Sequence, residues 1–174
     1  MWIHGGIVIA SGSSAPEEGL DCDRSQDFIV TGGILVGTGG AAVSTSTSST
    51  QRSVIYNGIA ATTGEIVAIL DADNKPILLY EFPRTMSKCA LFFSSAEIVA
   101  QKEYKVYSGG KIEGNTKNWN GIYLDGNYTA GTLLGSFTST ATTTTVGSSS
   151  GPGDGGRPGN GGPGNDGYGP GWWD

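Results

Sequence analysis

One phrase occurs twice near the start of this chain, and it constrains the fold more than any other feature of the sequence. Residues 3–12 read IHGGIVIASG and residues 30–39 read VTGGILVGTG, so the copies are offset by 27 positions. Each copy joins two apolar runs through a Gly-Gly corner. A unit this short cannot bury its own apolar face, so we expect the copies to stack as coils of a parallel β-helix, about 4.8 Å apart.

The composition favours an all-β architecture. The 174 residues include 30 glycines and only 15% charged residues, and Gly and β-branched residues are poor helix formers. We therefore expect right-handed parallel β-helix coils (a β-solenoid) followed by a C-terminal antiparallel β cap. This domain is expected over residues 1–147, and residues 148–174 form a Gly/Pro-rich tail without the strict triplet period of collagen.

Apolar runs after the repeats predict further strands. Residues 66–70 and 77–82 flank a cluster of turn-forming residues at 71–76, which is typical of a hairpin. A Ser/Thr-rich stretch at 41–50 predicts an extended or looped crossing. Further strand candidates, including a closing Ser/Thr-rich edge strand, are residues 88–93, 104–107, 133–137 and 136–145.

Charge and hydropathy argue against two classes of partner. The formal net charge is −6 and the ten basic residues are scattered, whereas nucleic-acid binding needs clustered Lys and Arg. No run reaches the 18 apolar residues of a membrane span. The first coil would leave an apolar, unpaired edge, so we expect further coils before Met1 or a neighbouring chain that covers this end.

A pair of acidic residues between the two repeats is the candidate metal site. Asp21 and Asp23 would share one face of a strand, and oxygen ligands suit Ca²⁺. Backbone carbonyls, Asp27 or water could complete the shell. Alternatively, both carboxylates are hydrogen-bonded turn residues, or Arg24 neutralises them.

Three aromatic residues in a Gly- and Asn-rich stretch are candidates for carbohydrate binding. Trp119, Tyr123 and Tyr128 could stack on the apolar faces of sugar rings. They could equally cover the end of the solenoid as a cap, and the sequence does not separate these alternatives. Asn127 begins an Asn-Tyr-Thr triplet that fits the N-glycosylation pattern.

The sequence offers little for catalysis. His4 is the sole histidine and lies in an apolar repeat, and no Gly-x-Ser-x-Gly nucleophile motif occurs. We therefore expect a protein that is not an enzyme. Cys22 and Cys89 are expected as small buried residues in strands, and whether they form a disulfide is left open.

A succession of phrases carries a family resemblance. Residues 19–23 (GLDCD) precede the second Gly-Gly phrase, the run at 66–70 is followed by Asp71 and Asp73, and later phrases complete the order: 93–95, 104–110 and 131–137. This succession resembles the C-terminal part of the secreted, calcium-containing carbohydrate-binding parallel β-helix family of clostridial and related bacteria, over roughly residues 1–147.

The resemblance implies an extracellular, non-catalytic module that binds cellulose or pectin-like polysaccharide and holds calcium in aspartate-lined coils. Only Asp21 and Asp23 match those acidic positions, and the earlier acidic coils of the family are absent. The competing prediction is a structural subunit of an extracellular filament or surface fibre. In that case solenoid ends would stack between chains and the Gly/Pro-rich tail would dock on a neighbour.

Overall fold

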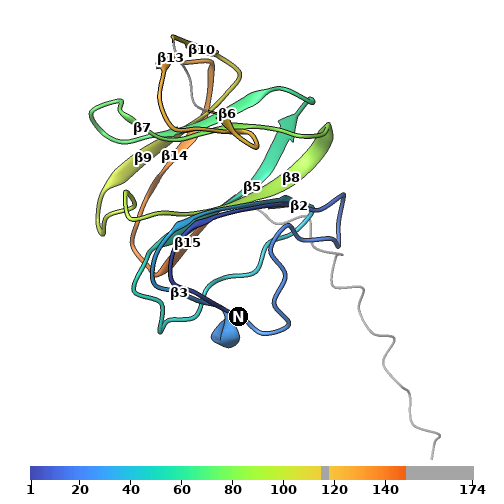
Figure 1. Ribbon diagram of the computed structural model, residues 1–174, viewed down its shortest axis with the longest axis vertical. Coiled ribbons are helices and arrows are strands. Elements are labelled where there is room, and N and C mark those ends of the chain that lie inside the picture. The colour runs from blue at the N-terminus through green and yellow to red at the C-terminus, as the bar shows by residue number, and fades with distance from the viewer. Residues whose placement is uncertain (115–117, 148–174) are drawn as a thin grey trace, which may run out of the picture.

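The computed structural model describes residues 1–114 and 118–147, which form two β-sheets that pack face to face (Figure 1). The five-stranded sheet has the order β15-β5-β8-β4-β2. Its strands are β2 (Ile7–Ser11), β4 (Ile34–Gly39), β5 (Ser53–Ala61), β8 (Met86–Ser94) and β15 (Thr143–Val146). The tail predicted at 148–174 lies outside the described residues.

The six-stranded sheet has the order β11-β12-β7-β6-β9-β14. Its strands are β6 (Ile66–Leu70), β7 (Pro76–Glu81), β9 (Glu103–Ser108), β11 (Asn118–Trp119), β12 (Ile122–Tyr123) and β14 (Thr132–Thr138). Two short ribbons flank the sheets: β1 (Trp2–Ile3) with β3 (Ile29–Val30), and β10 (Lys111–Glu113) with β13 (Asn127–Thr129). A single 3₁₀ turn, η1, spans Ser25–Asp27.

The two Gly-Gly phrases lie side by side in parallel, with the register that the repeat predicts. Trp2 of β1 is opposite Ile29 of β3, and Ile7 of β2 is opposite Ile34 of β4, so both pairs keep the offset of 27 residues. Backbone hydrogen bonds continue around the corner between them, from Thr31 N–H to the Ile3 carbonyl and from Ile34 N–H to the Gly6 carbonyl, both at 2.9 Å. The first two coils are therefore one stacked unit.

The all-β class is confirmed, but the described sheets are not those of a solenoid. β4 pairs with β8 in the antiparallel sense, and β8 pairs with β5 in the same sense. The parallel order of the coils thus stops after the second copy, where no third Gly-Gly phrase follows at the same spacing. The nine-residue strands β5 and β8 follow instead, and the five-stranded sheet is mixed, with the edge strand β15 parallel to β5.

Three apolar clusters show how the layers are held together. The largest fills the space between the two sheets and includes Val36, Tyr80 and Phe93. A second cluster lies on the other face of the five-stranded sheet, inside the coils, and includes Phe28 and Phe92 with ring centroids 5.5 Å apart. A third covers the outer face of the six-stranded sheet beneath the β10–β13 ribbon.

Most strands predicted from apolar runs are present. The hairpin predicted around residues 71–76 is β6 and β7, and the Asp71 carboxylate accepts backbone hydrogen bonds from Asp73 and Lys75 at 3.0 and 2.8 Å. The Ser/Thr-rich run predicted to close the domain is divided between the end of β14 and β15, and β15 lies at a sheet edge. Among the described residues, no helix is long and apolar enough to cross a membrane.

The two cysteines remain free thiols in the described part of the chain. Cys89 lies buried in β8, as expected, and burial raises its pKa to about 11. Cys22 is half-buried in a loop, where its thiol contacts the Arg24 carbonyl at 3.5 Å. The prediction that both are strand residues is therefore confirmed for Cys89 and wrong for Cys22.

Candidate functional site

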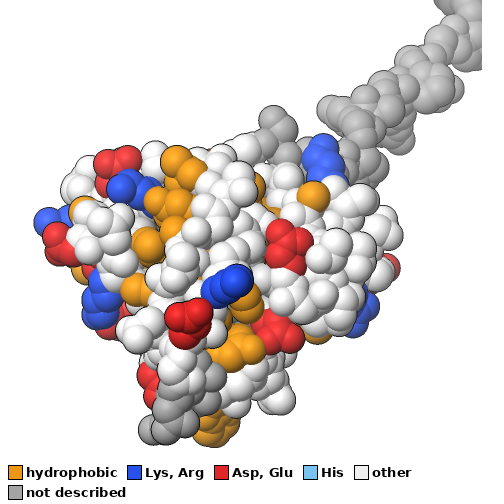
Figure 2. Space-filling view, turned by 90° about the horizontal axis from the view of Figure 1, so that it is seen from above, with side chains coloured by type: hydrophobic (Ala, Val, Ile, Leu, Met, Phe, Trp, Pro, Cys, Tyr) orange, Lys and Arg blue, Asp and Glu red, His pale blue; other side chains and the backbone are white. Residues whose placement is uncertain are grey.

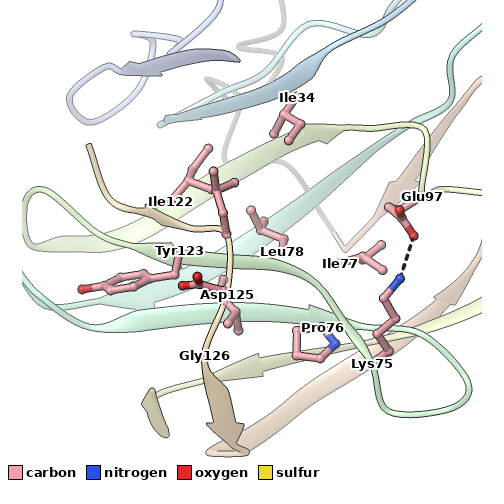
Figure 3. A pocket seen from close by; sticks show the side chains of 12 residues that line it. Ile34, Lys75, Pro76, Ile77, Leu78, Glu97, Ile122, Tyr123, Asp125 and Gly126 are labelled. Carbon is pink, nitrogen blue, oxygen red and sulfur yellow. Dashed lines mark hydrogen bonds and ion pairs between the residues drawn. The ribbon is translucent and has the colours of Figure 1, made fainter. Parts of the chain in front are cut away.

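A groove of about 320 Å³ opens along one margin of the sandwich, near β12, the strand next to the edge strand β11 of the six-stranded sheet. Ile34, Ile77, Leu78 and Ile122 supply its apolar floor, and the loop that follows β12 supplies one wall (Figure 3). An ion pair at the rim joins the Lys75 ammonium to the Glu97 carboxylate at 3.3 Å, and both side chains are exposed. The groove therefore combines an apolar floor with a charged, solvent-exposed rim, as small-molecule sites commonly do.

Trp119 does not itself line this groove, but it is paired with a residue that does, and its ring is exposed to solvent. It is 55% exposed and stands in the edge strand β11, directly opposite Ile122 of β12. Residues directly opposite in an antiparallel pair project from the same face of the sheet. Because Ile122 lines the groove, the indole of Trp119 projects on the groove side as well.

Tyr123 and Tyr128 have a different role from Trp119. Both belong to the cluster on the outer face of the six-stranded sheet, and Figure 3 shows the Tyr123 ring pointing away from Leu78 and Ile77. The Tyr123 hydroxyl donates to Glu81 at 2.5 Å, and this hydrogen bond, together with burial, raises the Tyr123 pKa. The Tyr128 hydroxyl donates to the Gly109 carbonyl at 2.9 Å, and burial raises its pKa. These two rings thus pack on the outer face of the six-stranded sheet, where Tyr123 also lines the groove, whereas Trp119 is the exposed ring. Carbohydrate binding by any of the three stays a prediction.

The predicted glycosylation residue lies on the surface near this cap. Asn127 is the first residue of β13 and its side chain is exposed. Figure 2, which looks onto the molecule from the β10–β13 side, shows small hydrophobic patches interspersed with acidic and basic side chains. An attached glycan at Asn127 would therefore meet solvent, and its presence stays a prediction.

The predicted metal pair does not lie on a strand. Asp21 and Asp23 fall in the loop between β2 and η1, and both are exposed. The strand prediction is wrong because this loop is pinned through Gly19 and Leu20: a Cβ at Gly19 would lie 2.5 Å from the Thr38 nitrogen, and Leu20 is buried in the coil core. Arg24 pairs with Asp27 at 2.7 Å. Asp27 is thereby engaged in an ion pair.

A further carboxylate near this loop, that of Glu18, was not predicted as a site residue. Its Oε2 atom is buried and has no hydrogen-bond partner among the described residues. Burial, and secondarily the charge of Asp21, raise the Glu18 pKa. An isolated bridge between Glu18 and Ala41 brings this residue beside the end of β4. Sequence reasoning missed it because the long-range bridge is not visible in a local pattern.

Substituting Glu18 with Gln should stabilise the protein at neutral pH, by less than about 1 kcal/mol since the side chain is only partly buried. Because the pKa of Glu18 is raised in the folded state, the folded protein is favoured below the ordinary pKa of glutamate, where the carboxyl is protonated. This stabilisation is lost as pH rises through the pKa that Glu18 has in the folded state. The gain from E18Q should therefore appear at pH 7 and vanish below about pH 4.5. Thermal melts of both proteins across this range measure it, and a gain that persists at pH 4 would indicate a packing effect instead.

Calcium at Asp21 and Asp23 stays a prediction. Within residues 1–114 and 118–147, no group of three or more acidic, His or Cys side chains gathers to hold a metal ion, whereas Ca²⁺ takes six to eight oxygen ligands. These two residues alone do not fit that requirement, so we derive no mechanism through calcium. If they do bind it, Ca²⁺ should raise the melting temperature of the wild type and not of D21A/D23A. Equal melting with Ca²⁺ and with chelator would refute the prediction.

Comparison with protein-family models, with curated proteins and with solved structures finds no match to this chain. The function is therefore inferred from the groove and its neighbouring side chains. Of the floor residues, Ile34, Ile77 and Leu78 were expected only as strand residues, and Ile122 lay in a stretch for which no strand was predicted. No local pattern indicated that residues from β4, β7 and β12 would meet at a groove.

Proposed function

We propose that this protein is a non-catalytic polysaccharide-binding module that acts outside the cell. The observation that carries the proposal is the exposed indole of Trp119 on the same side of the sheet as the apolar groove. A flat ring near an apolar floor can stack on sugar rings, whose C–H faces are apolar. Charged and polar groups at the rim can bond the hydroxyls.

The chemistry of the groove favours binding over bond cleavage. Glu97, one of the two carboxylates that line it, is ion-paired with Lys75, whereas glycoside hydrolysis pairs an ionised carboxylate with a protonated one across the scissile bond. His4 is engaged with the Thr31 hydroxyl at 2.7 Å in the coils. The resemblance of the sequence to secreted carbohydrate-binding β-helix domains supports the extracellular placement and the choice of cellulose and pectin as first ligands.

Retention on insoluble cellulose and on immobilised polygalacturonate tests the proposal. We expect the wild type to be retained on at least one of them and W119A to bind roughly fivefold more weakly, because one stacking contact is worth about 1 kcal/mol. Trp2 provides the matched control, since it is also exposed (68%) but belongs to the coils. Retention should be unchanged in W2A.

Two outcomes would contradict the proposal. The first is an absence of retention on any polysaccharide tested. The second is equal loss in W119A and W2A, which would indicate a general effect of removing exposed tryptophan. Circular dichroism of both variants would establish that each retains its fold.

A further inference from the structure

The corner of the second coil needs glycine because the first coil lies directly on it. A Cβ at Gly32 would lie 2.4 Å from the His4 carbonyl oxygen, and one at Gly33 would lie 2.8 Å from the Gly6 oxygen. Such distances are far inside van der Waals contact, and backbone atoms cannot easily move away. A neighbouring backbone thus crowds both positions of the second pair; it alone explains Gly32, whereas Gly33 also has a φ of 102° that favours glycine.

The first coil repeats this glycine pair, but no described atom crowds either member. A Cβ at Gly5 would meet nothing within 4 Å among the described residues. Gly6 has a φ of 85°, which by itself favours glycine. Gly5 has no such φ, so neither crowding nor backbone conformation within the described chain accounts for the absence of a side chain there.

The same end of the molecule presents unpaired strand edges. β2 is the last strand of its sheet, and β1 pairs only with β3 in the described part. The sequence of β2, Ile-Val-Ile-Ala-Ser, has no Lys, Pro or bulge of the kind that protects exposed edges. Trp2 beside it is 68% exposed. This edge is therefore chemically competent to accept another strand.

The opposite end of the coil stack is already covered. β4 pairs with the antiparallel strand β8. The crossing segment bonds the backbone of β3 and of Phe28 just before it, from Ser46 N–H to the Phe28 carbonyl at 2.7 Å and from Thr50 N–H to the Val30 carbonyl at 3.1 Å. Head-to-tail stacking of copies needs two open ends, and the described residues leave one.

We propose that the open end of the coil stack, formed by β1, Gly5, Gly6 and β2, is a docking surface for one further polypeptide β-coil that runs parallel to β1 and β2. Its backbone would lie on Gly5 as that of His4 lies on Gly32. Apolar side chains of this coil would sit over Ile3, Ile7 and Ile9, which are only partly buried. Two copies of this chain meeting at their open ends would be related by a two-fold axis and would pair β2 antiparallel, which does not reproduce the parallel stack.

A chain that carries a second copy of residues 1–27 in front of Met1 tests this proposal. The duplicate continues the 27-residue period, so we expect it to stack on the open end, raise the melting temperature by several degrees and slow amide hydrogen exchange in β2. G5A supplies the matched variant: alone it should melt like the wild type, whereas in the extended chain it should be as destabilising as G32A. A130V, an exposed change outside the coils, should have no effect in either chain.

Three results would overturn the proposal. One is unchanged exchange of the β2 amides in the extended chain, which reports on docking even if the melting temperature does not change. Another is a G5A cost that is the same with and without the duplicate. The third is a stable dimer of the unextended chain in analytical ultracentrifugation that protects the β2 amides. None of these readouts depends on Trp119, so failure here is distinguishable from failure of polysaccharide binding.

Discussion

Replacing Phe93 with alanine should lower the free energy of unfolding by about 4 kcal/mol, a large part of the 5–15 kcal/mol available to a typical domain. Phe93 is fully buried in β8, between Val36 of β4 and Val54 of β5, and its ring fills the space between the two sheets. Its removal leaves a cavity that rigid strands on three sides cannot close. In thermal melts the midpoint should fall by roughly 12 °C.

The neighbouring Phe92 makes the comparison informative. It is equally buried but faces the coil layer, where it contacts Phe28. F92A should also lower the free energy of unfolding by about 4 kcal/mol. Amide hydrogen exchange should accelerate first in β1 and β3 in F92A, but first in the six-stranded sheet in F93A. S87A, on the exposed part of the same strand, should change stability by less than about 0.5 kcal/mol. A cost under 1 kcal/mol for F93A would contradict the packing described between the sheets.

Replacing Gly32 with alanine should cost about 3 kcal/mol, an unusually large effect for the addition of one methyl group. The new Cβ would lie 2.4 Å from the His4 carbonyl oxygen, so the two coils must separate locally. Separation would weaken the adjacent hydrogen bonds from Thr31 to Ile3 and from Ile34 to Gly6. Overpacking of this kind typically costs about 1–3 kcal/mol. We expect a cost near the upper end of this range because the atoms that the new Cβ meets belong to the backbone and cannot easily move.

Gly5 occupies the equivalent position of the first coil and provides the control. Its Cβ would meet open space in the described chain, so G5A should leave chemical denaturation curves unchanged within about 0.5 kcal/mol. Equal costs for the two substitutions would mean that both reflect the unfolded state. In that case the stacked coils would not explain Gly32.

Local patterns in the sequence predicted the parts of this fold that depend on local or repeated chemistry. The offset between the Gly-Gly phrases predicted the pairing of Ile7 with Ile34, because equivalent residues of stacked coils align. Turn-forming residues around Asp71 predicted the β6–β7 hairpin. The pairing of β8 with both β4 and β5 was not predicted, since long-range antiparallel partners leave no mark on a single segment.

The candidate site shows the same limit at the level of single side chains. The sequence did not distinguish Trp119, Tyr123 and Tyr128 as candidates for carbohydrate binding. The β11–β12 register places Trp119 opposite Ile122 and Tyr123 opposite Asn118, so Trp119 and Tyr123 project from opposite faces of the sheet. Only the register separates an exposed ring from packed ones. The Asp21 and Asp23 pair failed as a strand face because Leu20 is anchored inside the coils, a tertiary contact that alternation does not reveal.

Strand β8 also restricts any extension of the coil stack to one end. A stack of identical parallel coils has two equivalent strand edges, and in principle it can lengthen at both without limit, as fibrils do. Strand β8 pairs with β4 of the second coil in the antiparallel sense, so the parallel repeat ends there and no further coil can stack on that edge. Any assembly formed through the coils of this chain could thus extend in one direction only. The sandwich and its groove would always lie at the end that cannot extend.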